Sequence, residues 1–388
     1  MRPRIKPALH RIWRDPHTLQ VGLDPAHALV LTGLDPVLAG VVDSLTGIRT
    51  EDALVTQAVA HGGSGADTRR LLRLLAEGGA LDDAGRAAAG AVPGLGPAER
   101  ERLLPDLAAR SVAEGSLDGG VATMSRRREA HIAVFGAGRV GASIITLVSS
   151  SGVAQVVVDD QAPTAPGDLA PAGLVAADVG TPRGEGAARA AAQAAPSTEV
   201  MAVSPGHPLE RPDLAVIAPD DEPDRRMADA FVRAGLPHLF VRMREGRAIL
   251  GPFVLPGVSS CIRCHDLRRT AHDPRWPSVL SQALAAPRGA EACDVVLATA
   301  LASHAVMHVL AFLEGGRPPS LDATIEMDLP FGSVRRRTWS AHPACGCQFD
   351  PEQHASDESD GPRDAGKTPR STGSSAHRRS GSSPMAAA

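Results

Sequence analysis

Four cysteines toward the carboxyl end of the chain are spaced like the ligands of a metal ion. Cys261 and Cys264 form a CxxC pair, and Cys345 and Cys347 form a CxC pair. Two thiolates from each pair complete a tetrahedral set, and soft thiolates that need no redox chemistry favour zinc. Because four protein ligands leave no open position, we predict a structural zinc that pins the end of the chain.

Two histidines and the fifth cysteine leave alternatives open. His265 and His342 lie close to the cysteine pairs and could replace a thiolate, although such neighbours are mostly bystanders. Cys293 stands apart, where an apolar helix is expected to begin. A thiol at a helix N-terminus can have a lowered pKa and act as a nucleophile, whereas a buried free cysteine is the commoner role.

A glycine-rich loop predicts a nucleotide site. Gly136, Gly138 and Gly141 have the GxGxxG spacing between a predicted strand and a predicted helix. These glycines permit the tight turn, the approach of a phosphate and close packing of the helix, whose N-terminus favours anions. Asp159 ends the next predicted strand, about 20 residues further on, where a ribose-binding acid is expected. The pattern predicts either a bound nucleotide or a Rossmann-like scaffold whose site is empty.

The elements that position these residues alternate between strands and helices from about residue 130. This alternation predicts an α/β fold with a doubly wound, mostly parallel sheet of the Rossmann type over residues 129–350. The polar run 266–277 is expected to form a loop that crosses this domain and contacts a partner enzyme, or a turn fixed by its two prolines.

Residues 1–91 are expected to form a small winged-helix-like α+β domain. Residues 18–24 and 27–34 alternate apolar and polar side chains, as strands do. Asp35 and Thr50 are candidate N-caps of two helices. A third helix is expected to place three leucines on one stripe: Leu71, Leu74 and Leu75.

The remaining segments are a connector and a tail. Residues 92–128 form the connector, with a possible helix followed by a loose stretch from residue 114. Residues 351–388 are polar and are expected to be disordered. We see no internal repeat in the chain.

The bulk composition excludes several functions. Of the 388 residues 43 % are hydrophobic and only 3 % are aromatic, with no Tyr, which argues against stacking on single-stranded nucleic acid. The net charge of −4 argues against general binding to nucleic acid or anionic membranes. No apolar run reaches the ~20 residues that span a bilayer, and no secretory signal is evident. We therefore expect a cytoplasmic protein that binds neither nucleic acid nor membrane.

The glycine loop, the acid, the sheet and the cysteines, in this order, resemble the ThiF/MoeB family. This family of ATP-dependent adenylyltransferases shares its fold with ubiquitin-activating enzymes and adenylates the C-terminal carboxylate of a small protein or peptide. The resemblance covers about residues 128–350. It implies ATP and Mg²⁺ as cofactors, with these roles: Asp159 for the ribose, Arg183 of "DVGTPR" for phosphate, Asp220 of "VIAPDDEPDRR" for magnesium and Arg225 at a recurrent arginine position.

One segment departs from the family's pattern. Active members carry an Asn-Leu-Asn-Arg-Gln type of run after the ribose acid, and here the corresponding run is "GDLAPAGL". Asp168 stands where Asn is expected, and Pro171 stands about where Arg is expected. Loss of one such electrostatic group typically costs ~3 kcal/mol of transition-state stabilisation. The pocket is expected to keep its shape and to be weakened as a catalyst.

A subfamily fits that expectation. The chain resembles the ThiF-like partners in azole and azoline peptide biosynthesis, most specifically in "CIRCHDLRRTAHDPRWPSVLSQAL". The resemblance implies an adaptor that binds a precursor leader peptide through its N-terminal domain and presents it to a YcaO-type cyclodehydratase. It also implies a homodimer. We expect residues 27–34 to offer the sheet edge for the peptide, unless this domain only packs on the larger one.

Two other functions remain as alternatives. The first is an active adenylyltransferase that uses basic residues from elsewhere in the chain. The second is a nicotinamide-dependent dehydrogenase, which would share the glycine loop but leaves the cysteine pairs unexplained.

Overall fold

The computed structural model describes residues 1–89, 92–203, 210–285 and 292–348. The predicted tail lies outside these described residues. Residues 1–349 belong to one compact unit.

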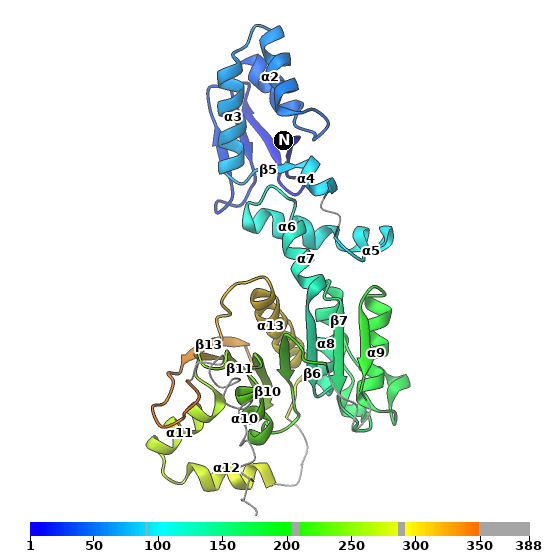
Figure 1. Cartoon of the computed structure of the whole chain (residues 1–388), viewed down its shortest axis with the longest axis vertical. Coiled ribbons are helices and arrows are strands. Elements are labelled where there is room, and N and C mark those ends of the chain that lie inside the picture. Colours follow the sequence, from blue (N-terminus) through cyan, green and yellow to red (C-terminus); the bar gives the residue numbers. More distant parts are fainter. Residues whose placement is uncertain (90–91, 204–209, 286–291, 349–388) are drawn as a thin grey trace, which may run out of the picture. The chain divides into compact units, whose positions relative to one another are not determined.

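An eight-stranded sheet forms the core of the larger domain (Figure 1). Its strand order is β13-β12-β11-β10-β9-β6-β7-β8. The strands β6 to β10 pair in parallel, and β11, β12 and β13 add an antiparallel extension. The bounds are β6 His131–Phe135, β7 Gln155–Asp159, β8 Glu199–Ala202, β9 Leu214–Ile217, β10 His238–Arg244, β11 Arg247–Val254, β12 Ala323–Asp328 and β13 Ser333–Thr338. The mixed, mostly parallel α/β sheet is confirmed, while the sequence did not predict the antiparallel extension.

Helices cover both faces of this sheet. One face packs on α8 (Arg139–Ser150), α9 (Arg183–Ala194) and α13 (Val295–Leu313). The other carries α10 (Arg225–Arg233) and α11 (Ile262–His272), which pack on Phe240 and Val254. By length and apolar composition alone, α13 could cross a membrane. Its buried side chains instead pack on α8, β10 and β11, which is the role of a core helix.

The parallel strands create a crevice at the point where their order reverses. From β6 the chain continues to β7 and β8, which lie on one side of β6. It then returns to β9, which lies on the other side of β6. Ligands of doubly wound sheets bind at such a point, outside the carboxyl ends of the strands. The glycine loop follows β6 and Asp220 follows β9, so both lie at this crevice.

The N-terminal region is a mixed unit of strands and helices. Two short strands pair with each other, β1 (Pro3–Ile5) and β5 (Leu81–Asp83), and a separate sheet has the order β2-β3-β4. Its strands are β2 Arg11–Asp15, β3 Thr18–Val21 and β4 Leu29–Leu31, and the helices are α1 Pro36–Asp43, α2 Glu51–Ala60 and α3 Gly65–Glu77.

Sequence signals located these N-terminal helices well. Asp35 and Thr50 accept hydrogen bonds from backbone N–H groups of the first turns, which confirms both N-caps. The predicted leucine stripe of α3 needs one correction, because Leu74 is 40 % exposed and Leu72 is buried in its place. The buried residues of α3 are Thr68, Leu71, Leu72 and Leu75, which are spaced by one, three and four positions. The buried stripe is therefore rotated by part of a turn from the predicted one.

The connector is more regular than the sequence suggested. It contains α5 (Pro97–Arg102), α6 (Leu104–Glu114) and nearly all of α7 (Val121–Glu129), and it follows α4 (Ala84–Ala89) of the N-terminal region. The stretch predicted to be loose therefore ends in a helix, whose N-cap Gly120 has φ +82°. Lys6 is buried and donates hydrogen bonds to Asp82 and to Ser111 of α6, which ties the connector to the N-terminal strands.

Candidate functional site

The glycine loop has the tight geometry that its sequence predicts. Gly136 has φ +97°, and a Cβ atom there would lie 2.3 Å from the carbonyl oxygen of Ala218. A Cβ atom on Gly138 would lie 2.3 Å from Oδ1 of Asp220. The backbone at Gly136 therefore accepts only glycine, whereas a side chain at Gly138 would have to displace the carboxylate of Asp220, against which the loop backbone lies.

Two adjacent aspartates end β7, and they have different roles. Asp159, the predicted ribose acid, has a pKa raised by burial and by the neighbouring carboxylate of Asp160. Asp160 accepts a hydrogen bond from the backbone N–H of Ala137 at 2.7 Å and so holds the glycine loop. The sequence analysis missed Asp160, although the Asp-Asp pair itself was the signal that could have found it.

Arg183, the predicted phosphate-binding residue, is held by two carboxylates. Its Nε and Nη2 donate to the two oxygens of Asp168 at 2.8 Å and 2.7 Å, and its Nη1 donates to Asp220. Burial lowers the pKa of Arg183, but the bonds to Asp168 and Asp220 outweigh it and leave this pKa raised. The guanidinium is thus neutralised by protein groups, in a bidentate geometry that favours a strong ion pair.

Two adjoining cavities open at this crevice. The glycine-loop cavity, about 520 Å³, is lined by Gly136, Asp159 and Asp160. The α12 cavity, about 850 Å³, is bordered on one side by α12 (Trp276–Ala285) and on the other by Asp168. Both cavities are lined by Arg183, Asp220, Asp221, Glu222 and Ala283. Such a pair of cavities could hold a nucleotide and, next to its phosphates, a second substrate.

Glu222 engages the arginines beside the cavities. Its carboxylate forms ion pairs with Arg225, Arg242 and Arg244. Burial raises the pKa of Glu222, but Arg242 and Arg244 outweigh it and leave the pKa lowered. Arg225 also binds Asp266 of α11 at 2.8 Å. The predicted Arg225 is therefore not among the described residues that line either cavity.

The α12 cavity also contains residues outside the predicted set. Arg139 lines it and donates from Nη1 to the backbone carbonyl of Cys293 at 2.6 Å. Cys293 is half-buried and directly precedes Asp294, the N-cap of α13. The helix start expected at Cys293 is confirmed to within two residues. Among the described residues, three arginines line this cavity, and each binds a protein group: Arg139, Arg183 and Arg244.

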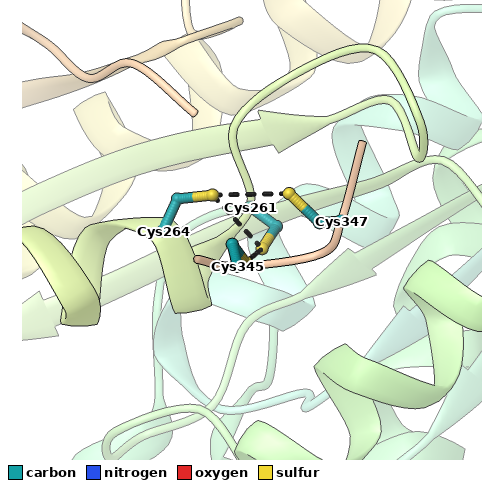
Figure 2. A group of neighbouring side chains, drawn as sticks. All are labelled: Cys261, Cys264, Cys345 and Cys347. Atoms are coloured by element: carbon teal, nitrogen blue, oxygen red, sulfur yellow. Dashed lines mark hydrogen bonds between the residues drawn. The ribbon is translucent and has the colours of Figure 1, made fainter. Parts of the chain in front are cut away.

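The four predicted cysteine ligands converge on one buried point (Figure 2). The Sγ atoms of Cys261 and Cys345 lie 3.5 Å apart, those of Cys264 and Cys347 lie 3.3 Å apart, and all four lie within 4.8 Å of one another. A tetrahedral ion with metal–sulfur bonds of about 2.3 Å separates its sulfurs by roughly 3.8 Å. The arrangement therefore fits a metal ion bound by four thiolates.

The surroundings of these sulfurs support the same conclusion. A bond from Cys261 and the backbone N–H of His342 lower the pKa of Cys264 to about 4. Burial and the neighbouring Cys264 raise the pKa of Cys345 to about 12. Thiols crowded in this way ionise together only when a cation compensates their charge. His265 instead stacks on Trp339, with ring centroids 4.3 Å apart.

The polar run 266–277 is mostly helical and not the expected loop; the alternative turn is present between the two helices, where it contains Pro274, whereas Pro277 lies in α12. Residues Ile262–His272 form α11, and α12 begins at Trp276. Arg268 anchors α11 by donating to the carbonyl oxygens of Ser340 and Ala341, both at 2.9 Å. Its charged residues form ion pairs on α11, where Asp266 binds Arg225 and Arg269, and a turn in which Asp273 accepts from the backbone N–H of Arg275.

The comparisons with known proteins agree with this geometry. The profile of the ThiF family matches residues 111–348, which is more than half of the chain. The chain belongs to the ThiF family. This assignment confirms the ThiF/MoeB-like resemblance and begins within the connector, at α6. Among curated proteins, none matches the sequence of this ThiF-family chain.

Solved structures share the fold of this ThiF-family protein at low sequence identity. E. coli MccB with ATP is 15 % identical, with a TM-score of 0.67 over 89 % of this chain and 99 % of MccB. The microcin C7 biosynthetic enzyme MccB in complex with N-formylated MccA is 15 % identical, with a TM-score of 0.65 over 90 % and 100 %. PaaA is 14 % identical, with a TM-score of 0.61 over 86 % and 99 %. The likeness extends beyond the ThiF domain to the N-terminal region.

Proposed function

We propose that this ThiF-family protein is an adaptor that binds a precursor leader peptide and presents it to a YcaO-type cyclodehydratase. The observation that carries the proposal is the clamp on Arg183, whose guanidinium is bound by Asp168 and Asp220. Adenylation depends on fixed positive charge around the phosphates of ATP. Here the cation at that position already has two protein partners.

The charge of the crevice argues in the same direction. Three carboxylates lie within 3.8 Å of the guanidinium of Arg183, the predicted phosphate-binding group; they belong to Asp160, Asp168 and Asp220. An ATP triphosphate would have to displace Asp168 from Arg183 and then lie beside that freed carboxylate. Magnesium could offset part of this repulsion, with Asp220 as its ligand.

The N-terminal region supports the peptide-binding half of the proposal. We assign it as a winged-helix-like module that accepts the leader peptide. Strand β4 pairs only with β3 among the described strands, so its other edge is open for a peptide strand. Leu29 of β4 lies near Gly78 at the end of α3, where a side chain of the peptide could pack. The fold shared with MccB in complex with N-formylated MccA includes this region.

The cysteine centre has a structural role in this proposal. Zinc is the ion that best suits four thiolates with no open coordination position. It would join the start of α11 to the segment that follows β13. The ion would stabilise the sheet side on which α10 and α11 pack.

A second function is an active adenylyltransferase that uses ATP on a peptide carboxylate. Arg139, Arg183 and Arg244 all line the α12 cavity, and the shared fold includes E. coli MccB with ATP. If the bound peptide displaced their present partners, these arginines would surround the phosphates.

Two measurements on the purified full-length protein separate these functions. We expect calorimetry to detect binding of a leader peptide encoded beside the gene, and we expect no ATP–pyrophosphate exchange with or without that peptide. Robust exchange that depends on a peptide carboxylate would replace the adaptor with the enzyme. Failure of every neighbouring leader peptide to bind would exclude the adaptor. Sedimentation of the same sample tests the proposed homodimer.

A further inference from the structure

A third cavity, about 730 Å³, lies beside the α12 cavity and shares Arg244 and Glu245 with it. We call it the arginine cavity. Its floor is the face of β10 to β13 on which Ile249, Thr324 and Glu326 lie. A ligand in the α12 cavity could therefore continue into the arginine cavity without leaving the surface of the domain.

Two arginines of this cavity have few protein partners. Arg337 of β13 makes no hydrogen bond or ion pair to a described residue, and its guanidinium lies 4.4 Å from the ring centroid of Trp339. Arg269 of α11 lies 4.9 Å from the ring of Trp276, and its Nη1 is buried without a hydrogen bond. The nearest carboxylate oxygen to that atom, in Asp266, is 3.8 Å away.

A third arginine adds positive potential beneath the same face. The side chain of Arg242 is 1 % exposed, and its Nε and Nη1 have no hydrogen-bond partner in the described part of the chain. Its Nε forms an ion pair with Glu222 at 3.9 Å. Burial lowers the pKa of Arg242 to about 9, and the guanidinium remains charged at neutral pH. A buried, incompletely paired cation is costly, and an anion nearby would offset that cost.

The lining restricts the class of anion. Glu245, Glu326 and Asp328 alternate with the arginines around the cavity. A phosphodiester chain carries one negative charge per nucleotide and would meet these carboxylates repeatedly. Separate carboxylates on a flexible chain can reach Arg269 and Arg337 while avoiding the acids. Acidic side chains therefore fit this cavity better than nucleic acid does.

The neighbouring strand favours an extended peptide as the carrier of these carboxylates. β13 is the edge of the sheet, and all six of its residues are exposed. Arg337 lies opposite Thr324 in the register, so its side chain shares the face of the cavity. The β12–β13 hairpin also exposes Phe331 by 90 % and Val334 by 57 %, which offers apolar contacts to the same chain.

We propose that the arginine cavity binds the acidic side chains of an extended peptide segment that lies along β13 beside the α12 cavity. Main-chain pairing with β13 would supply affinity, and Arg269 and Arg337 would select Asp or Glu. This inference rests on the proposed function, because it assumes that the natural ligand is a peptide. The inference adds to the proposed function that the peptide is acidic and that Arg269 and Arg337 recognise its carboxylates.

The test selects peptides without assuming a sequence. A phage library of random decapeptides is panned on immobilised full-length protein, on its Arg337→Glu variant and on a matched Arg233→Glu control. Arg233 is an exposed arginine of α10, outside the cavity. We expect the wild type and the control to enrich Asp and Glu over the unselected library. The best acidic peptide should bind the Arg337→Glu variant about tenfold more weakly, because like charges then face each other.

A second variant guards against a trivial loss of binding. Arg269→Gln removes one charge from the opposite wall and should reduce the affinity for the acidic peptide and leave that for its Gln-substituted analogue unchanged. Thermal melts confirm that both variants are folded.

Other outcomes would overturn the proposal in distinguishable ways. Two results would contradict the proposal for the arginine cavity: recovery of peptides without a preference for Asp and Glu, or equal affinity of the acidic peptide for the wild type and the Arg337→Glu variant. Either result leaves the proposed peptide-binding function intact. Recovery of no peptide by any form sinks both. If the library yields no acidic peptides, but labelled oligodeoxythymidine binds the wild type and not the Arg337→Glu variant, the cavity binds nucleic acid instead.

Discussion

The cysteine centre and the nucleotide crevice are both assembled from residues far apart in the sequence, yet they differ in completeness. At the cysteine centre four equivalent sulfurs surround one point at distances that fit a tetrahedral ion. At the crevice the backbone geometry is equally tight, but Arg183 already has Asp168 and Asp220 as partners. The charges of the four sulfurs require a cation, whereas the guanidinium at the crevice is already paired with carboxylates of the protein.

The difference shows how the shape of a site and its charge can be set by separate groups of residues. Shape at the crevice comes from glycines and strand ends, which the fold itself requires. Charge comes from a few side chains, and one carboxylate at position 168 is enough to occupy the arginine. A thiolate cluster has no such internal substitute, because its four negative groups can be compensated only by a cation.

The largest effect is expected from a substitution that removes one ligand of the cysteine centre. Cys347→Ser should release the metal and lower the melting temperature by at least about 10 °C, which corresponds to roughly 3–5 kcal/mol in a domain of this size. Metal analysis and calorimetry measure the two effects. Cys293→Ser is the matched control, since Cys293 lies outside the cluster. A wild-type protein without stoichiometric metal would contradict the assignment.

An intermediate effect is expected at Glu222, which holds the arginines beside the crevice. Glu222→Gln should cost about 3 kcal/mol of unfolding free energy at pH 7, because Arg242 loses its nearest counter-charge while buried. The pKa of Glu222 is lowered in the folded protein, so its contribution exists above the usual value of 4.5 and disappears as the pH falls through the folded value.

Urea titrations at pH 7 and near pH 4 measure this dependence. The gap in stability between wild type and Glu222→Gln should narrow at the lower pH. The exposed Glu199→Gln serves as control and should be neutral at both values. A gap that is independent of pH would show that Glu222 acts through packing and not through its charge.

The smallest effect is expected from a substitution that removes a negative charge from the crevice. Asp168→Asn should remove one of the two carboxylates that bind Arg183, leave Asp220 as its partner, and tighten ATP binding about tenfold, or ~1.4 kcal/mol, as measured by calorimetry. Asp178→Asn is a close control. Like Asp168, Asp178 caps a short 3₁₀ turn and binds an arginine, here Arg189 at 2.5 Å, but it lines neither cavity. Equal ATP affinity in all three proteins would mean that the clamp on Arg183 does not limit the site.

Local sequence signals predicted most of the parallel half of the fold. The buried strands β6, β7 and β9 contain short apolar runs, β10 contains the run Leu239 to Val241, and the glycine spacing located the loop between β6 and α8. The antiparallel strands β11 to β13 escaped notice. β13 reads "SVRRRT", with three consecutive arginines and no buried residue, so it has no hydrophobic pattern to detect.

The candidate sites divided in the same way. CxxC and CxC spacings located all four sulfurs, because short spacings fix which residues can share an ion. The clamp between Arg183 and Asp168 spans 15 positions and depends on how two 3₁₀ turns fold back toward α9. A sequence shows both charges, but only coordinates show that they bind each other. Arg225 was likewise expected at the crevice, but in the structure its guanidinium binds Asp266 of α11.

The exposed edge at β13 has a consequence for the behaviour of the protein in concentrated solution. An open edge strand invites a second chain to extend the sheet, which is a common route to fibres and precipitation. In an edge-to-edge pair of two copies, the run of three arginines, Arg335 to Arg337, would face its own duplicate across the new seam. Electrostatic repulsion would then keep identical molecules apart, and high salt, which screens it, should make this protein less soluble.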